Sequence, residues 1–163
     1  MKLNVSEALA QPGREFRFSG TQAIADQEIS GDLVRIDDAE LEGNFLSDEE
    51  GNISLRGTIR AIAHAPCANC LEETEAEVRN EFDETFIRGG DPEDPEIFAY
   101  EGHEIEMDRL AMSYAVMALP IRFLCREDCP GLSYQDTEAA PGQPGIQYPF
   151  AGLRQLLDRN EEV

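Results

Sequence analysis

Apolar and polar residues alternate along residues 53–63 of the chain. The apolar set falls on odd positions and the polar set on even ones: Ile53, Leu55, Ile59, Ala61 and Ala63 against Ser54, Arg56, Thr58 and Arg60. This period of two predicts a β-strand with one buried face and one face in solvent. Gly57 falls on the apolar face, where a missing side chain is typical of a bulge or a bend.

The same alternation returns over residues 76–86. One side holds apolar residues and the other charged ones: Ala76, Val78, Phe82 and Phe86 against Glu77, Arg79, Glu81 and Asp83. The two segments therefore predict neighbouring strands joined by a turn. Shorter alternations predict strands at residues 39–45 and around Phe16 and Phe18, and the polar residues 48–52 predict the turn before Ile53.

The second half of the chain favours loops and helix. Residues 89–95 are acidic and rich in Gly and Pro, which predicts a loop. Asp108 is in a position to cap a helix over residues 109–119, which Pro120 would end. Its apolar residues are spread over most of the circumference, so we expect the helix to be buried or covered on two sides.

The end of the chain divides into a linker and a short helical segment. Residues 133–147 are rich in Pro, Gly and Ala, and residues 148–163 carry Phe150, Leu153 and Leu157 at helical spacing. We expect these three residues to be partner-binding anchors, docking either on residues 1–132, which we predict to be a single domain, or on another protein.

Length and composition fit one globular domain. With 163 residues, 41% of them hydrophobic and 29% charged, the chain can bury a sizeable core. The elements together predict an α+β fold, with a curved, barrel-like antiparallel sheet and helices packed on one side. The first ten residues do not resemble a signal peptide and no segment is long enough to span a membrane, so we expect a cytoplasmic location.

Four cysteines form the clearest chemical signal. They lie in two close pairs, Cys67 with Cys70 and Cys125 with Cys129, and the chain has no others. Two thiolate pairs complete the tetrahedral shell that structural zinc prefers, so the four are candidate zinc ligands. Reduced thiols without metal and a disulfide or redox pair are the alternatives. The redox alternative lacks the helix that normally follows a reactive CxxC, because Cys67 follows a predicted strand.

The charge balance is strongly acidic. The formal net charge is -21, which repels a phosphate backbone over most of the surface. A basic protein partner suits this surface better than RNA, although the acidity can also serve solubility alone. Neither histidine is placed for nucleophilic catalysis: His64 is a reserve metal ligand near the first cysteine pair, and His103 lies in an acidic loop.

The order of these features resembles the YceD-like family from about Asp32 to the end of the chain. The resemblance rests on a strand that runs into CxxC, a second strand ending near Phe86, and later motifs in a fixed order. These are Ile105 to Leu110, Ala118-Leu119-Pro120, Leu124-Cys125 with Cys129, and a Pro-Phe-Ala-x-Leu-x-x-Leu segment from Pro149 to Leu156. Many relatives have further cysteines after Gly131-Leu132, where this chain continues with Ser133, so a second metal site is not expected.

The resemblance implies a function in ribosome assembly. Members of the family are linked to accumulation of large-subunit ribosomal RNA and are described as possible metal or nucleic-acid binders. We therefore expect a non-enzymatic factor that supports 23S ribosomal RNA accumulation by binding a basic ribosomal protein or assembly factor, with RNA association indirect and no membrane partner. A zinc- or thiol-dependent enzyme and an acidic chaperone for a basic ribosomal protein are the alternatives.

Overall fold

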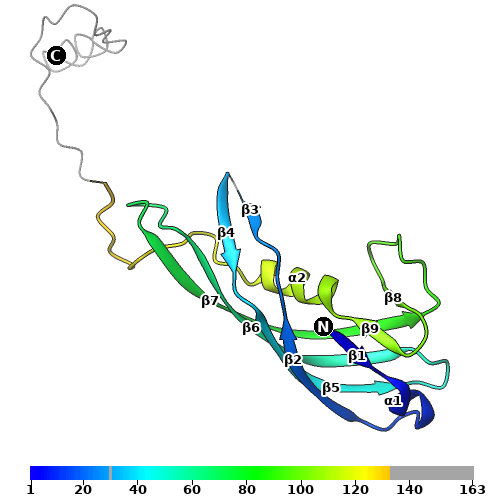
Figure 1. The fold of residues 1–163 in the computed structure, drawn as a ribbon. Coiled ribbons are helices and arrows are strands. Elements are labelled where there is room, and N and C mark those ends of the chain that lie inside the picture. The colour runs from blue at the N-terminus through cyan, green and yellow to red at the C-terminus, as the bar shows by residue number, and fades with distance from the viewer. Residues whose placement is uncertain (30, 133–163) are drawn as a thin grey trace, which may run out of the picture. The chain divides into compact units, whose positions relative to one another are not determined.

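Two long antiparallel strands, β6 (Ile53–Pro66) and β7 (Glu73–Arg88), form the centre of the structure. The computed structural model describes residues 1–29 and 31–132. Ile53 pairs with Phe86 at one end of the two strands, and Pro66 pairs with Glu73 at the other. Both predicted strands are confirmed, and each extends beyond the alternating segment that indicated it. Figure 1 shows the two strands as curved ribbons that cross most of the domain.

The second edge of β6 is shared by two neighbours. Its first half pairs with β5 (Ala39–Ser47), and its end pairs with β4 (Asp32–Ile36). Farther out, β2 (Phe16–Gln22) pairs with β5 and β3 (Gln27–Ile29) pairs with β4. These pairings are antiparallel. Because β6 is longer than either neighbour, the sheet divides into two arms on this side.

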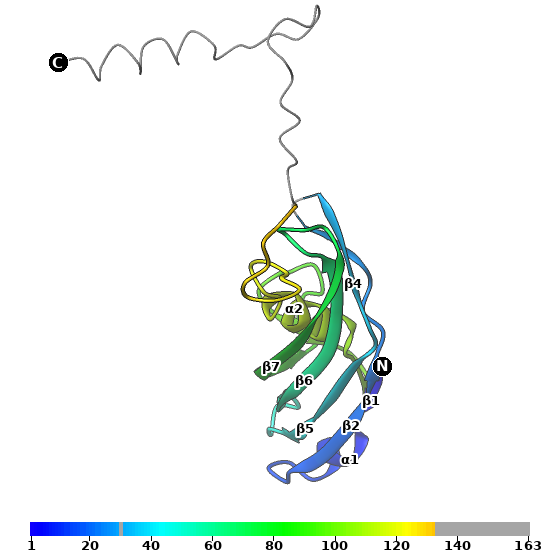
Figure 2. The same ribbon diagram turned by 90° about the vertical axis from the view of Figure 1, so that its left-hand side faces the viewer.

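The remaining elements are short. They are β8 (Phe98–Tyr100), which pairs with β7 in parallel, the two-stranded sheet of β1 (Lys2–Asn4) and β9 (Glu104–Glu106), and the helices α1 (Ser6–Ala10) and α2 (Asp108–Met117). Figure 2 shows α2 beside the long strands, and its contacts are with β5, β6 and β7. The helix buries Leu110, Ala111 and Ala115. Met107 is its N-cap, so Asp108 begins the helix rather than capping it.

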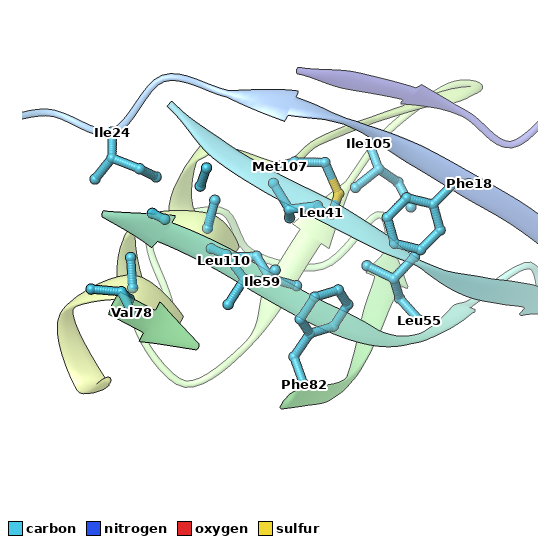
Figure 3. Close-up of a cluster of buried hydrophobic side chains, with 14 of the residues drawn as sticks. Phe18, Ile24, Leu41, Leu55, Ile59, Val78, Phe82, Ile105, Met107 and Leu110 are labelled. Atoms are coloured by element: carbon cyan, nitrogen blue, oxygen red, sulfur yellow. The ribbon is translucent and has the colours of Figure 1, made fainter. Parts of the chain in front are cut away.

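Two glycines lie at the centre of the buried face. Gly43 on β5 and Gly57 on β6 face each other. Phe18 on β2 pairs with Gly43, and Phe82 on β7 pairs with Gly57. The two phenylalanine rings have centroids 6.4 Å apart, and both are buried. Figure 3 shows them in one cluster with Leu55 and other core side chains. Aromatic rings beside strand glycines restore the apolar area that the glycines lack.

The predicted α+β, barrel-like fold class is wrong, because the protein is mainly β. Of the described residues, 48% are in strands and 11% in two helices, and the sheet is not a closed barrel. The sheet stays open because β2 and β3 each have one neighbouring strand, so the two arms beside β6 do not meet in a continuous ring. One ten-residue helix on the sheet is too little to form a helical layer.

Within the described residues, no helix is both long enough and apolar enough to cross a membrane. A compact unit spans Met1–Leu132. The predicted linker at 133–147 and the predicted helical segment at 148–163 lie outside the described residues, as do Phe150, Leu153 and Leu157.

Candidate metal centre

The first cysteine pair lies in the turn that joins β6 to β7. The backbone N–H of Cys67 donates to the carbonyl of Glu72 at 2.8 Å, and the N–H of Leu71 donates to the carbonyl of Cys67 at 2.9 Å. Leu71 has a φ of 65°, in the left-handed region that reverses a chain tightly. The turn therefore has a fixed geometry, with Cys67 and Cys70 inside it.

The segment after α2 brings the second pair to this turn. The N–H of Ala68 donates to the carbonyl of Phe123 at 2.8 Å, and Asn69 Nδ2 donates to the carbonyl of Cys129 at 3.2 Å. A further bond within the segment runs from the N–H of Cys129 to the carbonyl of Arg126, at 3.2 Å. Hydrogen bonds thus hold together two parts of the chain that are far apart in sequence, and each part carries one cysteine pair.

The four sulfurs gather at one point. Cys67 Sγ lies 3.9 Å from Cys129 Sγ, and Cys70 Sγ lies 3.7 Å from Cys125 Sγ. All four sulfur atoms lie within 4.8 Å of one another. Cys67 is buried, Cys70 and Cys129 are half-buried, and Cys125 is exposed. The site therefore has an inner side against the domain and an outer side toward solvent.

These distances fit a four-thiolate zinc site. With zinc–sulfur bonds of about 2.3 Å, the sulfurs of a tetrahedral site lie about 3.8 Å apart, which matches the two measured pairs. A disulfide requires sulfurs about 2.05 Å apart, and all four cysteines are free. Neither pair begins a helix, which is the usual setting of a redox CxxC. The donor set and its geometry thus agree with a closed structural metal site.

Backbone amides at the site favour a thiolate at Cys67. The N–H groups of Cys125, Cys70 and Asn69 lower the pKa of Cys67 to about 6. The N–H of Cys125 approaches its sulfur to 3.4 Å. Hydrogen bonds of this kind hold a metal-ligating atom in place and are the usual second layer of a metal site. The thiol of Cys67 therefore gives up its proton more readily than the thiols of Cys70 and Cys125.

The thiols of Cys70 and Cys125 resist ionisation while no cation is present. The N–H of Glu72 lowers the pKa of Cys70, but burial and contacts with the other three sulfurs outweigh it and raise that pKa to about 12. The contact with Cys129 and burial also raise the pKa of Cys125. Neighbouring groups of like charge oppose one another's ionisation. Four thiolates at this spacing thus need a cation between them.

The histidines lie apart from the cluster. His64 Nε2 is 3.2 Å from Asp37 Oδ2, across the pairing of β6 with β4, and His64 is not among the residues that converge on the site. His103 is exposed, and its carbonyl accepts a bond from the N–H of Val5. The expectation of a reserve ligand at His64 thus finds no support in the geometry.

Sequence reasoning missed the residues that hold the two cysteine pairs together. Asn69 is the main one, because its side chain reaches the carbonyl of Cys129 from inside the first pair. Its position between Cys67 and Cys70 was visible in the sequence, but a polar residue is common in any turn. Phe123 acts through its backbone carbonyl, for which the sequence offers no signal.

Comparisons with known proteins identify the family of the chain. Residues 55–157 match the family model described as large ribosomal RNA subunit accumulation protein YceD. Uncharacterized proteins from Mycobacterium tuberculosis and Mycobacterium bovis are 25% identical to the chain over 156 residues, which cover 91% of this chain and 74% of theirs. No solved structure matches the chain. The matched region contains β7, α2, most of β6 and all four cysteines, and the chain therefore belongs to the YceD family.

Proposed function

We propose that this protein is a non-enzymatic factor in large ribosomal subunit biogenesis that supports accumulation of 23S ribosomal RNA. The observation that carries the proposal is the family match over residues 55–157, because the family description refers to accumulation of the large ribosomal RNA subunit. In this proposal the domain acts by binding a ribosomal protein or an assembly factor, and its contact with RNA is indirect.

The proposal assigns the cysteines a structural zinc ion. Cys67, Cys70, Cys125 and Cys129 would hold it, and the ion would join the turn between β6 and β7 to the segment after α2. A catalytic zinc normally has three protein ligands and one open position, whereas four thiolates close the shell. The donor set therefore supports a structural role over the zinc-dependent enzyme that we considered as an alternative.

Charge supports a protein partner over direct RNA binding. The net charge is -21, and arginines on the outer face of the sheet lie beside carboxylates. Arg56 Nε is 3.0 Å from Asp83 Oδ1, and Arg60 is 3.7 Å from Glu42 Oε1. Phosphate binding depends on clustered, available cations that release counterions. Binding of a basic protein does not require free cations on this surface, and the attraction between opposite charges would speed its association.

We further propose a cytoplasmic location, because ribosome assembly and reduced thiols both belong to that compartment.

Elemental analysis of protein purified without chelator tests the metal. We expect about one zinc ion per chain, as four thiolates form one site. Less than about a tenth of an equivalent of any transition metal, together with four thiols that react readily in the folded protein, would refute the zinc assignment.

Deletion of the gene tests the function. We expect the ratio of large-subunit to small-subunit ribosomal RNA to fall in deleted cells and to be restored by the intact gene. A variant with Cys67→Ser and Cys70→Ser should restore less RNA than a control with Ser19→Ala, an exposed position on β2. An unchanged RNA ratio in the deleted cells would refute the proposed function, whatever the metal content.

A further inference from the structure

Exposed apolar side chains gather at the end of the domain that carries the cysteines. Among the described residues, the large hydrophobic side chains with high exposure come from the β3–β4 hairpin, the cysteine turn, the C-terminal end of α2 and the segment that follows. They are Ile29, Leu33, Leu71, Met117, Ile121 and Leu132. Single exposed apolar residues are ordinary, but a group confined to one end of a domain is typical of an interaction site.

A groove lies among these segments. Its volume is about 330 Å³, and apolar groups from β4, the end of β6 and the segment after α2 line most of it. Val34 and Ala65 form its floor, and Ile29 and Ile121 stand at its margin with exposed fractions of 38% and 102%. A second hollow of about 160 Å³ shares Ala65 and adds Leu33 and Leu71. The surface is thus hollowed on both sides of the end of β6, and the second hollow also carries the polar residues Arg35, His64 and Glu73.

The cysteine site forms part of the groove wall. Ala68 and Phe123 both line the groove, and they are joined by the hydrogen bond that brings the two cysteine pairs together. Ala68 lies between Cys67 and Cys70, and Phe123 lies two residues before Cys125. A metal that fixes the cysteines therefore also fixes the distance between the β6 side of the groove and the α2 side.

Acidic residues surround this apolar surface. The segments that form the groove and the cysteine site carry exposed carboxylates: Glu28, Asp32, Glu72, Glu73, Glu127 and Asp128. Of the nearby cations, Arg35 pairs with Glu73, and Arg126 lies 3.6 Å from Asp128. Arg122 and Asp32 both line the groove. The rim therefore keeps a negative balance that complements a basic ligand.

We propose that this groove binds an extended basic segment of a protein partner, with one or two apolar side chains of that segment inserted between Ile29 and Ile121. The inference rests on the proposed function, since it specifies where the partner of that function binds. The apolar anchors would supply affinity by leaving water, and lysines or arginines beside them would meet the acidic rim. Anchors in a pocket surrounded by polar contacts are the usual anatomy of a protein interface.

Two synthetic peptides test the groove with the 163-residue chain, purified without chelator. The first alternates Lys and Ser around a central Phe-Leu pair, and the second has Gly-Gly in place of Phe-Leu. At about 0.15 M salt, where exposed charges more than about 8 Å apart are largely screened, we expect the first peptide to bind at least about tenfold more tightly, or about 1.4 kcal/mol. Equal affinities would show that charge alone attracts the peptide, and would overturn the proposal.

A matched pair of variants locates the binding site. Ile121→Asp places a carboxylate in the groove and should abolish the advantage of the Phe-Leu peptide. Thr21→Asp adds the same charge on the exposed face of β2 and should leave that advantage intact. Ile121 is exposed, so Ile121→Asp should leave thermal unfolding unchanged, whereas Thr21→Asp faces Glu40 on β5 and should lower stability slightly. An advantage that survives in Ile121→Asp would overturn the proposal.

The proposal would also be overturned if the groove binds a second copy of the chain or the C-terminal segment of the chain itself. If sedimentation shows a dimer that Ile121→Asp dissociates, the surface contacts a second copy of the chain. If Leu153→Asp in the full chain tightens binding of the Phe-Leu peptide tenfold, the C-terminal segment of the chain is the native occupant.

Cell experiments separate this inference from the function on which it rests. If the gene deletion lowers large-subunit ribosomal RNA and Ile121→Asp restores it fully, the function stands and the groove is not its binding site. If the deletion itself leaves the RNA unchanged, the proposed function fails. The peptide measurements then decide the groove by themselves.

Discussion

Two regions of the long β6–β7 pair are held together by different means. Around Gly57, in what we call the sheet body, side chains from four strands bury one continuous apolar face that includes Leu41, Ile59 and Phe82. Beyond Pro66, at what we call the cysteine end (residues 67–72 and 123–131), Cys67 is the only buried residue. Four sulfurs and a few backbone hydrogen bonds take the place of a core there.

The two regions differ in what stabilises them: burial of apolar area in the sheet body, and the proposed binding of a cation at the cysteine end. Buried apolar area stabilises the sheet body whenever water is the solvent, because the driving force is the removal of that area from water. The cysteine end has little such area, so under the proposed metal assignment its stability would depend on a cation that neutralises four thiolates. We therefore expect the two regions to respond separately to core substitutions and to metal removal.

The largest effect should come from the sheet body. Phe82→Ala removes a side chain that is 3% exposed and packs against Phe18 and Tyr114, with ring centroids 6.4 and 5.8 Å away. It also uncovers Gly57, whose register partner on β7 is Phe82. We expect the free energy of unfolding to fall by about 3–5 kcal/mol, the usual cost of a large aromatic truncation. Urea denaturation of protein purified without chelator measures it.

The same substitution sharpens the comparison if metal content is followed. Phe82→Ala should retain a full equivalent of metal in native conditions, because residue 82 lies well along β7 from the cysteine end. A variant that loses its metal together with its stability would show that the two regions unfold as one unit.

Metal removal should act chiefly on the cysteine end. A ligand that binds only the folded state stabilises it by about 2.7–4.1 kcal/mol when present at 100 to 1000 times its dissociation constant. We expect that loss in the amide exchange of Ala68 and Leu71 after chelation, and in Cys125→Ser without chelator. The amide of Ile59, in the sheet body, should keep its protection. Equal loss of protection at all three amides would break the distinction between the regions.

Gly57→Ala tests how closely the sheet body is packed. A Cβ at this position would overlap the carbonyl oxygen of Glu42 and come 2.8 Å from Phe82 Cζ. Because a backbone oxygen cannot move aside easily, we expect a loss of about 1–3 kcal/mol, as for other overpacked cores. Gly20→Ala is the control, since its Cβ meets the flexible side chain of Met1. Denaturation curves that coincide for the two variants would contradict this account.

The sequence predicted the long strands better than it predicted how they assemble. Alternation marked β6 and β7 because each has one wet face, and it placed Cys67 and Cys70 in the turn between them. It gave no sign that β6 would serve two neighbours, which is why the barrel-like α+β fold was wrong. Three-residue strands such as β1 and β8 are too short for a period to show, and their partners are set by tertiary contacts.

The sequence predicted the ligands of the cysteine site but not the contacts that bring them together. The two close pairs identified all four candidate ligands. The contacts that bring them together, such as Ala68 N–H to the carbonyl of Phe123, involve backbone groups that every residue has. The exposed apolar residues Ile29 and Ile121 also escaped notice, because a single isoleucine in a short strand or loop predicts burial as readily as exposure.

The smallest expected effect lies where α2 meets β7, inside the sheet body. Tyr114 Oη donates to Glu84 Oε1 at 2.6 Å, and this bond, with burial and the charge of Glu84, raises the pKa of Tyr114 to about 12. Tyr114→Phe removes the bond but keeps the ring beside Phe82. We expect a loss of about 1 kcal/mol at neutral pH, the net value of one hydrogen bond.

Alkaline unfolding distinguishes the hydrogen bond from packing at the same residue. Because the folded protein holds the Tyr114 proton more tightly than the unfolded chain, whose tyrosines have a pKa near 10, the contribution of this group is complete below about pH 10. It declines as pH rises toward about 12, where the folded tyrosine ionises. The difference in stability between the native chain and Tyr114→Phe should therefore shrink across that range. A constant difference from pH 8 to pH 11.5 would assign the loss to ring packing, and a metal-dependent difference would tie this contact to the cysteine end instead.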